Sequence, residues 1–317
     1  MCKRELIRNS IGWLAAAIVS LSASTALAEG FTGTRAFVYS NGTFTTLSYP
    51  NAHSTLPSEI NNAGDIVGTV VDSGGGQPAF LYSKGRFVTL DFPGAAFTEP
   101  SDINDAGTIV GRKSADHTWS TYVYSDGAFH DLGGDPVTGS SGEGINNANH
   151  LLESNCTGYC PVNSGVVRDL SAPGAPVLAV IAYPGASSTK VSGINDAGHI
   201  VGTYHGYRSF LYVDGAYTAI DVPGAGETHA LGINNRDDIV GSFLDQAGVH
   251  GFIYTKGVFT KVDFPGAIQT YLWGVNDAGT VVGWAGLIPE PDSVALLAVG
   301  LACLGLVGPI RSRVARG

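Results

Sequence analysis

The 317-residue sequence predicts an all-β fold, and three observations carry that prediction. Glycine accounts for 44 residues, about twice its usual share. Charged residues make up only 14% of the chain while hydrophobic residues reach 44%, which is the opposite of a disordered chain. A unit of about 42 residues also recurs along the sequence. Glycine without a three-residue period excludes collagen, and together with many aromatic and β-branched residues it is typical of short strands joined by tight turns.

The clearest repeated element is a turn motif that occurs six times. It reads Ile-Asn-Asn-Ala-Gly-Asp-Ile-Val-Gly at 60–68 and Ile-Asn-Asp-Ala-Gly-Thr-Ile-Val-Gly at 103–111, with a worn copy at 145–153. The other copies begin at Ile194, Ile233 and Val275, so the start-to-start spacings are 43, 42, 49, 39 and 42 residues. Such a fixed period predicts a repeat architecture.

A second motif alternates with the first and predicts a hairpin. In its copy at 79–95, two apolar stretches at 79–83 and 86–92 flank the dipeptide Lys84-Gly85, a strong signal for a two-residue turn. The related copies begin at Ala36, Thr121, Ser209 and Gly251. Each unit therefore contributes at least two antiparallel strands.

Two further strands complete the unit. The segment Pro93-Gly94-Ala95 breaks the second strand and turns the chain. A third strand is expected to end at Asn104, and a fourth to begin at Thr108. The turn between them places Gly107 where a left-handed backbone is needed.

Four strands in about 42 residues predict a β-propeller blade, and six units predict a six-bladed ring. We expect the ring to close between the unit that starts near Ala36 and the one that ends near Trp284. Burial on both faces explains apolar runs such as Ile-Val, and the glycine that follows allows backbones to approach closely near the axis. The rival architecture is a linear β-solenoid, whose turns usually use shorter repeats.

The N-terminal segment, residues 1–28, predicts a secretory signal peptide. Lys3, Arg4 and Arg8 precede an apolar stretch at 11–21 that is too short to span a bilayer comfortably. The small residues of the expected cleavage site are Ala26 and Ala28. A secretion translocon is the implied partner, and the alternative is an uncleaved anchor.

The C-terminal segment, residues 289–317, combines a Pro-Glu-Pro motif, an apolar run at 294–310 and an arginine cluster. The motif and cluster residues are Pro289, Glu290, Pro291, Arg311, Arg313 and Arg316. This order resembles the PEP-CTERM sorting signal of Gram-negative bacteria. The resemblance implies recognition and cleavage by an exosortase, with transfer from an inner-membrane intermediate to the cell surface or extracellular space.

The apolar run at 294–310 is about 17 residues long, the lower limit for a transmembrane helix, and the arginines would stay on the cytoplasmic side. We therefore expect a C-terminal transmembrane helix that holds the chain in the membrane before processing. The alternative to a sorting signal is a plain membrane anchor.

The exported part, residues 29–288, is acidic. It carries 11 Lys and Arg against 24 Asp and Glu, a net charge of −13. Nucleic-acid binding requires a basic surface and is therefore disfavoured. Its two cysteines, Cys156 and Cys160, predict a local disulfide in an oxidising compartment, because a metal site would lack ligands beyond His150.

One unit departs from the pattern. It spans 49 residues, contains the cysteine pair, and has an apolar segment at 176–182 that predicts a buried strand. The irregularity either marks a binding loop or reflects a blade that has diverged in sequence and is held together by the disulfide. The second interpretation is preferred.

Catalytic and metal-binding patterns are weak. The Asn-Asp pairs of the turns, such as Asn104-Asp105, supply one carboxylate each, so we interpret them as turn caps rather than calcium ligands. A second set, Asp91, Asp221 and Asp263, could ring a central channel, but a structural hydrogen bond is preferred. His199 and His205 could meet within one hairpin, although two ligands make a weak metal site. The sequence has no zinc-protease, serine-hydrolase or phosphate-loop motif, so no cofactor or metal is expected.

Aromatic side chains could stack on sugar rings. The candidates are Trp119, Trp273, Tyr204 and Tyr207. Aromatic residues in blades belong to the core more often, which is the preferred interpretation.

The two motifs together resemble the HAF family of extracellular repeats. The turn hallmark is almost intact at Gly193–Gly202, and the aromatic hallmark is approximate at His250–Tyr254. The resemblance covers 33–286 and implies an extracellular protein without an assigned reaction. We expect a non-catalytic surface module that binds envelope glycan, such as an exopolysaccharide, or another surface protein. The alternative is a carbohydrate-active enzyme with two acidic groups about 5–10 Å apart at the channel.

Overall fold

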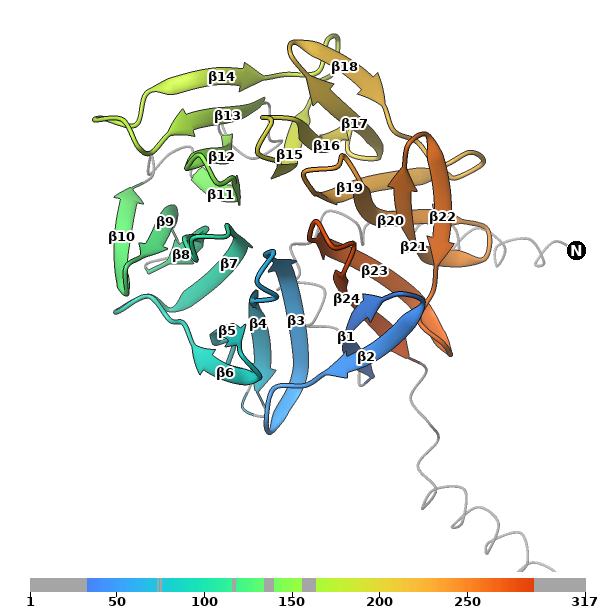
Figure 1. Cartoon of the computed structure of the whole chain (residues 1–317), viewed down its shortest axis with the longest axis horizontal. Helices are drawn as coiled ribbons and strands as arrows, with labels where there is room; N and C mark the ends of the chain where they lie inside the picture. The colour runs from blue at the N-terminus through green and yellow to red at the C-terminus, as the bar shows by residue number, and fades with distance from the viewer. Residues whose placement is uncertain are drawn as a thin grey trace, which may run out of the picture. The chain divides into compact units, whose positions relative to one another are not determined.

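The computed structural model describes residues 33–72, 74, 76–115, 118–133, 140–155 and 164–287. These residues form 24 β-strands that surround a central axis (Figure 1). The predicted signal peptide with Ala26 and Ala28, the disulfide between Cys156 and Cys160, and the sorting segment 289–317 all lie outside the described residues.

Sixteen strands form four separate four-stranded antiparallel sheets. The first contains β3 (Ala52–Ile60), β4 (Ile66–Asp72), β5 (Ala79–Ser83) and β6 (Arg86–Thr89). The second contains β7 (Phe97–Ile103), β8 (Ile109–Ser114), β9 (Trp119–Ser125) and β10 (Ala128–Gly133). The third contains β11 (Ser140–Ile145), β12 (His150–Asn155), β13 (Ser164–Asp169) and β14 (Val177–Ile181). The fourth contains β15 (Thr189–Ile194), β16 (Ile200–Tyr204), β17 (Arg208–Val213) and β18 (Ala216–Ala219).

The remaining eight strands form one continuous sheet. One half contains β19 (Glu227–Ile233), β20 (Ile239–Asp245), β21 (Gly248–Thr255) and β22 (Val258–Val262). The other half contains β23 (Ala267–Val275), β24 (Val281–Leu287), β1 (Thr34–Ser40) and β2 (Thr43–Leu47). A single parallel pair, Val249 with Gln269, joins the two halves.

The predicted propeller architecture is confirmed as a fold class, but the prediction of six separate blades is wrong. The described residues form four separate four-stranded blades and one eight-stranded sheet. The cause lies at Gly248, whose φ is +139°. Because this residue has no side chain, β21 begins close to β23: a Cβ at this position would lie 3.2 Å from the carbonyl oxygen of Ile268. The close approach lets the two halves pair in parallel at one position, Val249 with Gln269.

The expected C-terminal transmembrane helix is also corrected. The elements in the described part of the chain are all β-strands, and no helix there is long and apolar enough to cross a membrane. The segment 294–310, on which that prediction rested, lies outside the described residues. The fold that the structure supports is therefore all-β.

The two ends of the described chain close the ring, as predicted. Strand β1 pairs antiparallel with β24, from Thr34 opposite Gly286 to Tyr39 opposite Val281. The N-terminal pair β1 and β2 thus completes a sheet begun by the C-terminal pair β23 and β24 (Figure 1). Closure in this way leaves no open edge at the junction between the ends.

The predicted hairpin turns are confirmed. Lys84 and Gly85 both have positive φ, 49° and 79°. A two-residue turn needs positive φ at both positions when its twist matches that of the flanking strands. Strand β6 ends at Thr89, three residues before the predicted end. Asp91 explains the difference. Its carboxylate accepts a hydrogen bond from the Ala79 N–H, so a side chain replaces the backbone carbonyl that would continue the pairing of β5 with β6.

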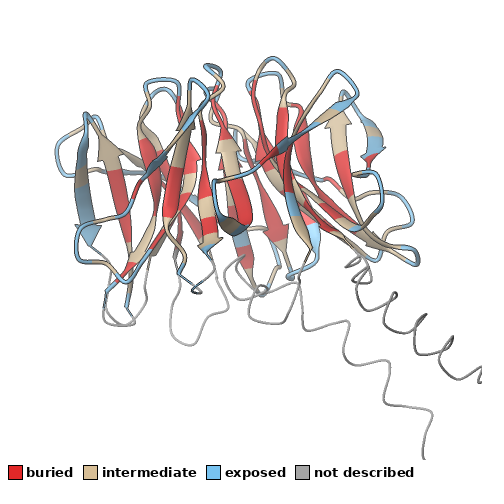
Figure 2. Ribbon diagram, turned by 90° about the horizontal axis from the view of Figure 1, so that it is seen from below, coloured by how far each residue is buried: buried red, intermediate tan, exposed pale blue. Residues whose placement is uncertain are grey.

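The hydrophobic core lies between neighbouring sheets, and buried residues occupy the middle of the strands (Figure 2). Gly68 shows how the glycine after Ile-Val permits this packing. A Cβ there would collide with the carbonyl oxygen of Leu56 and lie 2.9 Å from the ring of Phe80. The predicted close backbone approach is confirmed.

One buried strand was predicted wrongly. The segment 176–182 does form β14, but Val177, Leu178 and Val180 are 49%, 52% and 62% exposed. Strand β14 is the outermost of its sheet, so only Ile181 reaches the core. An apolar run alone does not distinguish an inner strand from an outer one.

A substitution of Phe37 tests the sheet in which β1 and β2 join β23 and β24. Its ring is fully buried on β1, with centroids 5.0 Å from Phe44 and 5.4 Å from Phe264. We expect Phe37→Ala to lower the free energy of unfolding by about 3–5 kcal/mol, because the truncation leaves a cavity. The measurement is urea denaturation of the purified chain. Phe97→Ala, at a 42% exposed position, is the control and should cost less than about 1 kcal/mol; equal losses would contradict a stabilising role for the closing strands.

Candidate functional site at the asparagine turns

The six copies of the turn motif line one cavity at the axis of the propeller. Each copy contributes a buried asparagine at its second position: Asn61, Asn104, Asn146, Asn195, Asn234 and Asn276. In the first copy, the Asn61 Oδ1 accepts hydrogen bonds from the N–H groups of Ala63 and Asp65, at 3.1 and 2.9 Å. The other five copies repeat this pattern. The side-chain carbonyl thereby builds the turn.

The other end of each amide joins neighbouring repeats. The Asn61 Nδ2 donates to the carbonyl oxygen of Asn104 at 3.1 Å, and each following asparagine does the same to the next copy. The last link, from Asn276 Nδ2 back to the Asn61 carbonyl at 3.2 Å, closes the circle. We call these six residues the inner ring.

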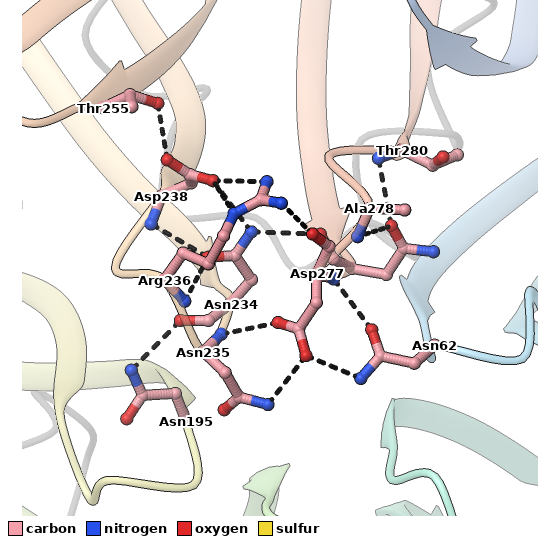
Figure 3. A network of polar contacts seen from close by, with 11 residues as sticks. Asn62, Asn195, Asn234, Asn235, Arg236, Asp238, Thr255, Asp277, Ala278 and Thr280 are labelled. Carbon is pink, nitrogen blue, oxygen red and sulfur yellow. Dashed lines mark hydrogen bonds and ion pairs between the residues drawn. The ribbon is translucent and has the colours of Figure 1, made fainter.

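The next residue of each copy forms a second circle, which we call the outer ring. Around the axis its members alternate between amide and carboxylate: Asn62, Asp105, Asn147, Asp196, Asn235 and Asp277. The Nδ2 of each asparagine donates to the Oδ2 atoms of both flanking aspartates, at 2.8–3.0 Å. Each backbone N–H donates to the Oδ1 of the next member at 2.8–2.9 Å. Figure 3 shows the part around Asn62, Asn235 and Asp277.

Hydrogen bonds within the outer ring stabilise the ionised form of Asp105. Burial raises the pKa of Asp105, but hydrogen bonds from the Asn62 N–H, the Asn62 amide and the Asn147 amide outweigh it and hold that pKa below its usual range. The sequence predicts that the Asn-Asp pairs of the turns are turn caps with one isolated carboxylate each. The structure instead brings Asp105, Asp196 and Asp277 into one ring, although the amides occupy their oxygens. No group of three or more His, Cys, Asp or Glu placed to hold a metal ion occurs in the part of the chain that the structure describes.

Two more carboxyl groups line the same cavity, those of Glu59 and Asp102. The Asp102 Oδ1 accepts the Ile103 N–H at 2.6 Å, and its Oδ2 accepts the Ile145 N–H at 2.7 Å. The Glu59 Oε1 accepts the Ile60 N–H at 2.9 Å. The cavity has a volume of about 70 Å³, well below the roughly 300–1,000 Å³ of ligand pockets.

Sequence reasoning missed this pair, although a signal was present. The residue before Ile-Asn or Val-Asn is glycine in four copies, at Gly144, Gly193, Gly232 and Gly274. In the other two it is Glu59 or Asp102. Aligning the copies by their asparagines would have singled out both acids.

The fifth turn, at 233–241, carries a distinctive cation (Figure 3). The other turns have alanine where this one has Arg236. Its Nε and Nη2 donate to the Asp238 Oδ2 at 3.0 and 2.8 Å, and its Nη1 donates to the Asp277 carbonyl oxygen. Thr255 Oγ1 donates to the other oxygen of Asp238 at 2.7 Å. The guanidinium is thus fixed while its side chain remains 52% exposed.

Arg236 lies at the edge of a larger pocket of about 320 Å³. The pocket is lined by Arg236, Asp238, Ile253, Thr255, Lys256, Val275, Gly279 and Val281. Its volume falls within the range of small-molecule sites. We call it the interblade pocket, because β21 supplies Ile253 while β23 and β24 supply Val275 and Val281.

The aspartates that could have ringed a channel do not do so. Asp91 accepts the Ala79 N–H at 2.9 Å, and Asp221 accepts the Ser209 N–H at 3.2 Å. Asp263 contacts His250 at 2.9 Å. None of the three lines the axial cavity, and the structural interpretation of this position is supported.

The histidine and aromatic candidates are dispersed. His199 pairs with Asp237 at 2.7 Å, whereas His205 contacts Ser187 at 3.3 Å, so the two do not share a site. Tyr204 stacks on Tyr183 with centroids 3.7 Å apart.

The other aromatic candidates differ in exposure. Trp119 lies under Arg112, and the Trp273 Nε1 is buried. Tyr207 is 46% exposed.

Comparison with known proteins identifies the fold only. No protein-family model and no curated protein sequence matches the chain. A putative TolB from Agrobacterium tumefaciens matches with a TM-score of 0.58 at 9% identity, over 81% of this chain and 99% of that one. TolB from Acinetobacter baumannii matches with a TM-score of 0.53 at 12% identity, over 81% of this chain and 65% of that one. At such identities the likeness shows the propeller fold and nothing further about activity.

Asn195 tests the inner ring. Its Nδ2 donates to the Asn234 carbonyl at 3.0 Å and to the Asp237 Oδ1 at 2.8 Å. Asn195→Asp keeps the acceptor oxygen but sets a carboxylate against two acceptors, so we expect a loss of about 1–3 kcal/mol at pH 7. The loss should shrink in acid, where protonation of the new carboxyl restores a donor.

Thermal and urea denaturation at several pH values provide the measurement. Asn41→Asp makes the same change in an exposed hairpin turn and should leave stability nearly unchanged. An equal effect of the two variants would show that the ring does not hold the repeats together.

Proposed function

We propose that the chain is an exported, non-catalytic surface module that binds envelope glycan through the interblade pocket. The observation that carries this proposal is the contrast between its two cavities. The axial cavity of about 70 Å³ is filled by hydrogen-bonded turns, whereas the interblade pocket offers about 320 Å³ beside a fixed guanidinium. Only the second has room for a sugar ring.

The chemistry of the interblade pocket suits a carbohydrate. Ile253 is partly exposed there, above the buried Val275 and Val281, and offers an apolar surface for one face of a pyranose. Arg236 and Lys256 supply donors for hydroxyl or carboxylate groups of a glycan.

Asp238 keeps the guanidinium in place. Burial raises the pKa of Asp238, but hydrogen bonds from Thr255, Arg236 and Asn234 outweigh it and hold that pKa below its usual range. The carboxylate therefore remains ionised near neutral pH and positions Arg236 before a ligand arrives. A preorganised donor of this kind favours affinity because little ordering accompanies binding.

The enzymatic alternative required two acidic groups in a cleft large enough for a glycosidic bond. Glu59 and Asp102 are an acidic pair, but they bind backbone N–H groups inside the axial cavity. The volume of that cavity leaves no place for a sugar between them. The geometry therefore favours binding without turnover.

Export is proposed from the sequence. The charged and apolar parts of residues 1–28 support passage through a secretion translocon, and Pro289-Glu290-Pro291 supports processing by an exosortase. The net charge of −13 on residues 29–288 supports solubility outside the cell and gives no support to a nucleic-acid partner. The final location would be the cell surface or the extracellular space.

Binding of the purified chain to an array of neutral and acidic envelope oligosaccharides, followed by calorimetry, tests the proposal. We expect Arg236→Ala to weaken binding at least about tenfold, because a hydrogen bond to a charged group contributes roughly 1.5–3 kcal/mol. Lys256→Asn should weaken it about threefold, since this more mobile cation lies on a hairpin turn.

Lys84→Asn is a matched control for Lys256→Asn. Lys84 lies at the same place in its own hairpin, has the same positive φ and does not line the pocket, so its replacement should leave binding unchanged. A hydrolase screen on the same sugars completes the experiment. Unchanged binding by Arg236→Ala, or release of sugar by the wild type, would refute the proposal.

A further inference from the structure

Glu59 and Asp102 replace glycine at one position in two neighbouring repeats, and their carboxyl groups connect repeats. Asp102, at the end of β7, accepts the N–H of Ile103 and also that of Ile145 on β11. Glu59, at the end of β3, accepts the N–H of Ile60 and packs directly against Gly274 on β23, next to Val275. The contact with β23 crosses the junction between two sheets. One contains β3 to β6, and the other is the eight-stranded sheet in which β23 and β24 join β1 and β2.

The space for Glu59 comes from the opposite strand. A Cβ on Gly274 would collide with the carboxyl group and lie 2.7 Å from the Glu59 Cα. Gly144 has the corresponding place beside Asp102, where a Cβ would lie 3.3 Å from the Asp102 Oδ2. Each acid therefore fits against a glycine of an adjacent repeat, and the pair is built into the ring rather than added to its surface.

The charges around the pair are all acidic. The titratable residues that line the cavity are Glu59, Asp102, Asp105, Asp196 and Asp277. No lysine, arginine or histidine is among the residues that line it. The inner strands around the axis also carry His53, Glu99, Glu143, Lys190, Glu227 and His229, but these do not line the cavity. Two neighbouring carboxylates without a counter-cation strongly favour retention of a proton.

We propose that Glu59 and Asp102 retain a proton between them and form a pH-sensitive latch on closure of the ring. With the proton bound, the pair bridges β3, β7, β11 and β23 at little electrostatic cost. When the proton leaves, two negative charges share one cavity that three aspartates also line. The repulsion weakens the contacts that hold the first repeat to its neighbours.

The direction of the pH effect follows from the folded-state ionisation. Burial raises the pKa of Asp102 to about 7. Burial, and then the charge of Asp102, raise the pKa of Glu59 well above its usual range. A carboxyl group whose pKa is raised by folding stabilises the folded state in acid. For Asp102 this contribution is lost as the pH rises from its ordinary value near 4 to about 7.

The test measures the unfolding equilibrium of the full chain by urea denaturation between pH 5 and pH 8.5. For each proton that the native state retains and the unfolded state has lost, the unfolding constant rises about tenfold per pH unit. We expect such a rise in the wild type and a flatter profile in the double variant Glu59→Gly and Asp102→Gly. That variant gives all six repeats the glycine already found in four of them.

Asp214→Asn is the matched control. It removes one carboxylate from an exposed hairpin turn and should keep the slope of the wild type. A slope that persists in the glycine double variant would overturn the proposal, because the proton would then reside elsewhere.

A measurement on the wild type covers the case in which the double variant does not fold. The amide resonances of Ile60, Ile103 and Ile145 should shift together with pH, since their N–H groups bind the two carboxyls. Infrared spectra should show a protonated carboxylic acid that disappears over the same range. Absence of both signals between pH 5 and pH 9, or their removal by added Na⁺ or Ca²⁺ at constant pH, would overturn the proposal.

Discussion

The rest of the structure depends on the side-chain amide of the inner ring. One planar group performs two tasks: its Oδ1 fixes the turn of its own repeat, and its Nδ2 binds the next repeat. Aspartate could accept the turn hydrogen bonds but could not donate the link, and glutamine would hold the two ends at the wrong separation. The circle closes from Asn276 back to Asn61 beside the sheet in which β1 and β2 complete β23 and β24. The amide ring and the pairing of the chain ends therefore support each other.

The outer ring places a constraint on sequence that no single repeat reveals. Each asparagine there donates to two carboxylates, so a donor must always stand between two acceptors. Around a closed ring this alternation requires an even number of members, which the six turns satisfy. Even the worn third copy keeps Asn147 between Asp105 and Asp196. The variation between Asn-Asn and Asn-Asp in the motif is thus a pattern set by the neighbours, rather than tolerance at a turn.

The repeats predicted local structure well because their signals are local. Hairpin turns such as Lys84-Gly85 follow from backbone sterics within a few residues. Aligning the repeats would single out Glu59 and Asp102, but neither their contacts nor the sheet count could be predicted. Both depend on contacts between repeats, such as Gly248 beside Ile268 or Glu59 beside Gly274.

The worn copy shows the same limit. Glu153 stands where the other copies have the glycine after Ile-Val, and the strand opposite compensates with Gly142 in register with it. From the sequence alone this copy looks like a damaged motif. In the fold, the larger side chain at Glu153 is matched by the missing side chain at Gly142 on the paired strand.

Asp105 and Asp102, which line the same axial cavity, respond to pH in opposite directions. Asp105 has a lowered pKa, so its contribution to stability is lost as the pH falls. The contribution of Asp102 is instead lost as the pH rises towards 7. Stability should therefore be greatest between the two ranges. Val275 lies between the two sites, because it follows Gly274, against which Glu59 packs, and also belongs to the interblade pocket. The axial cavity and the interblade pocket are thus separated by a single residue of β23.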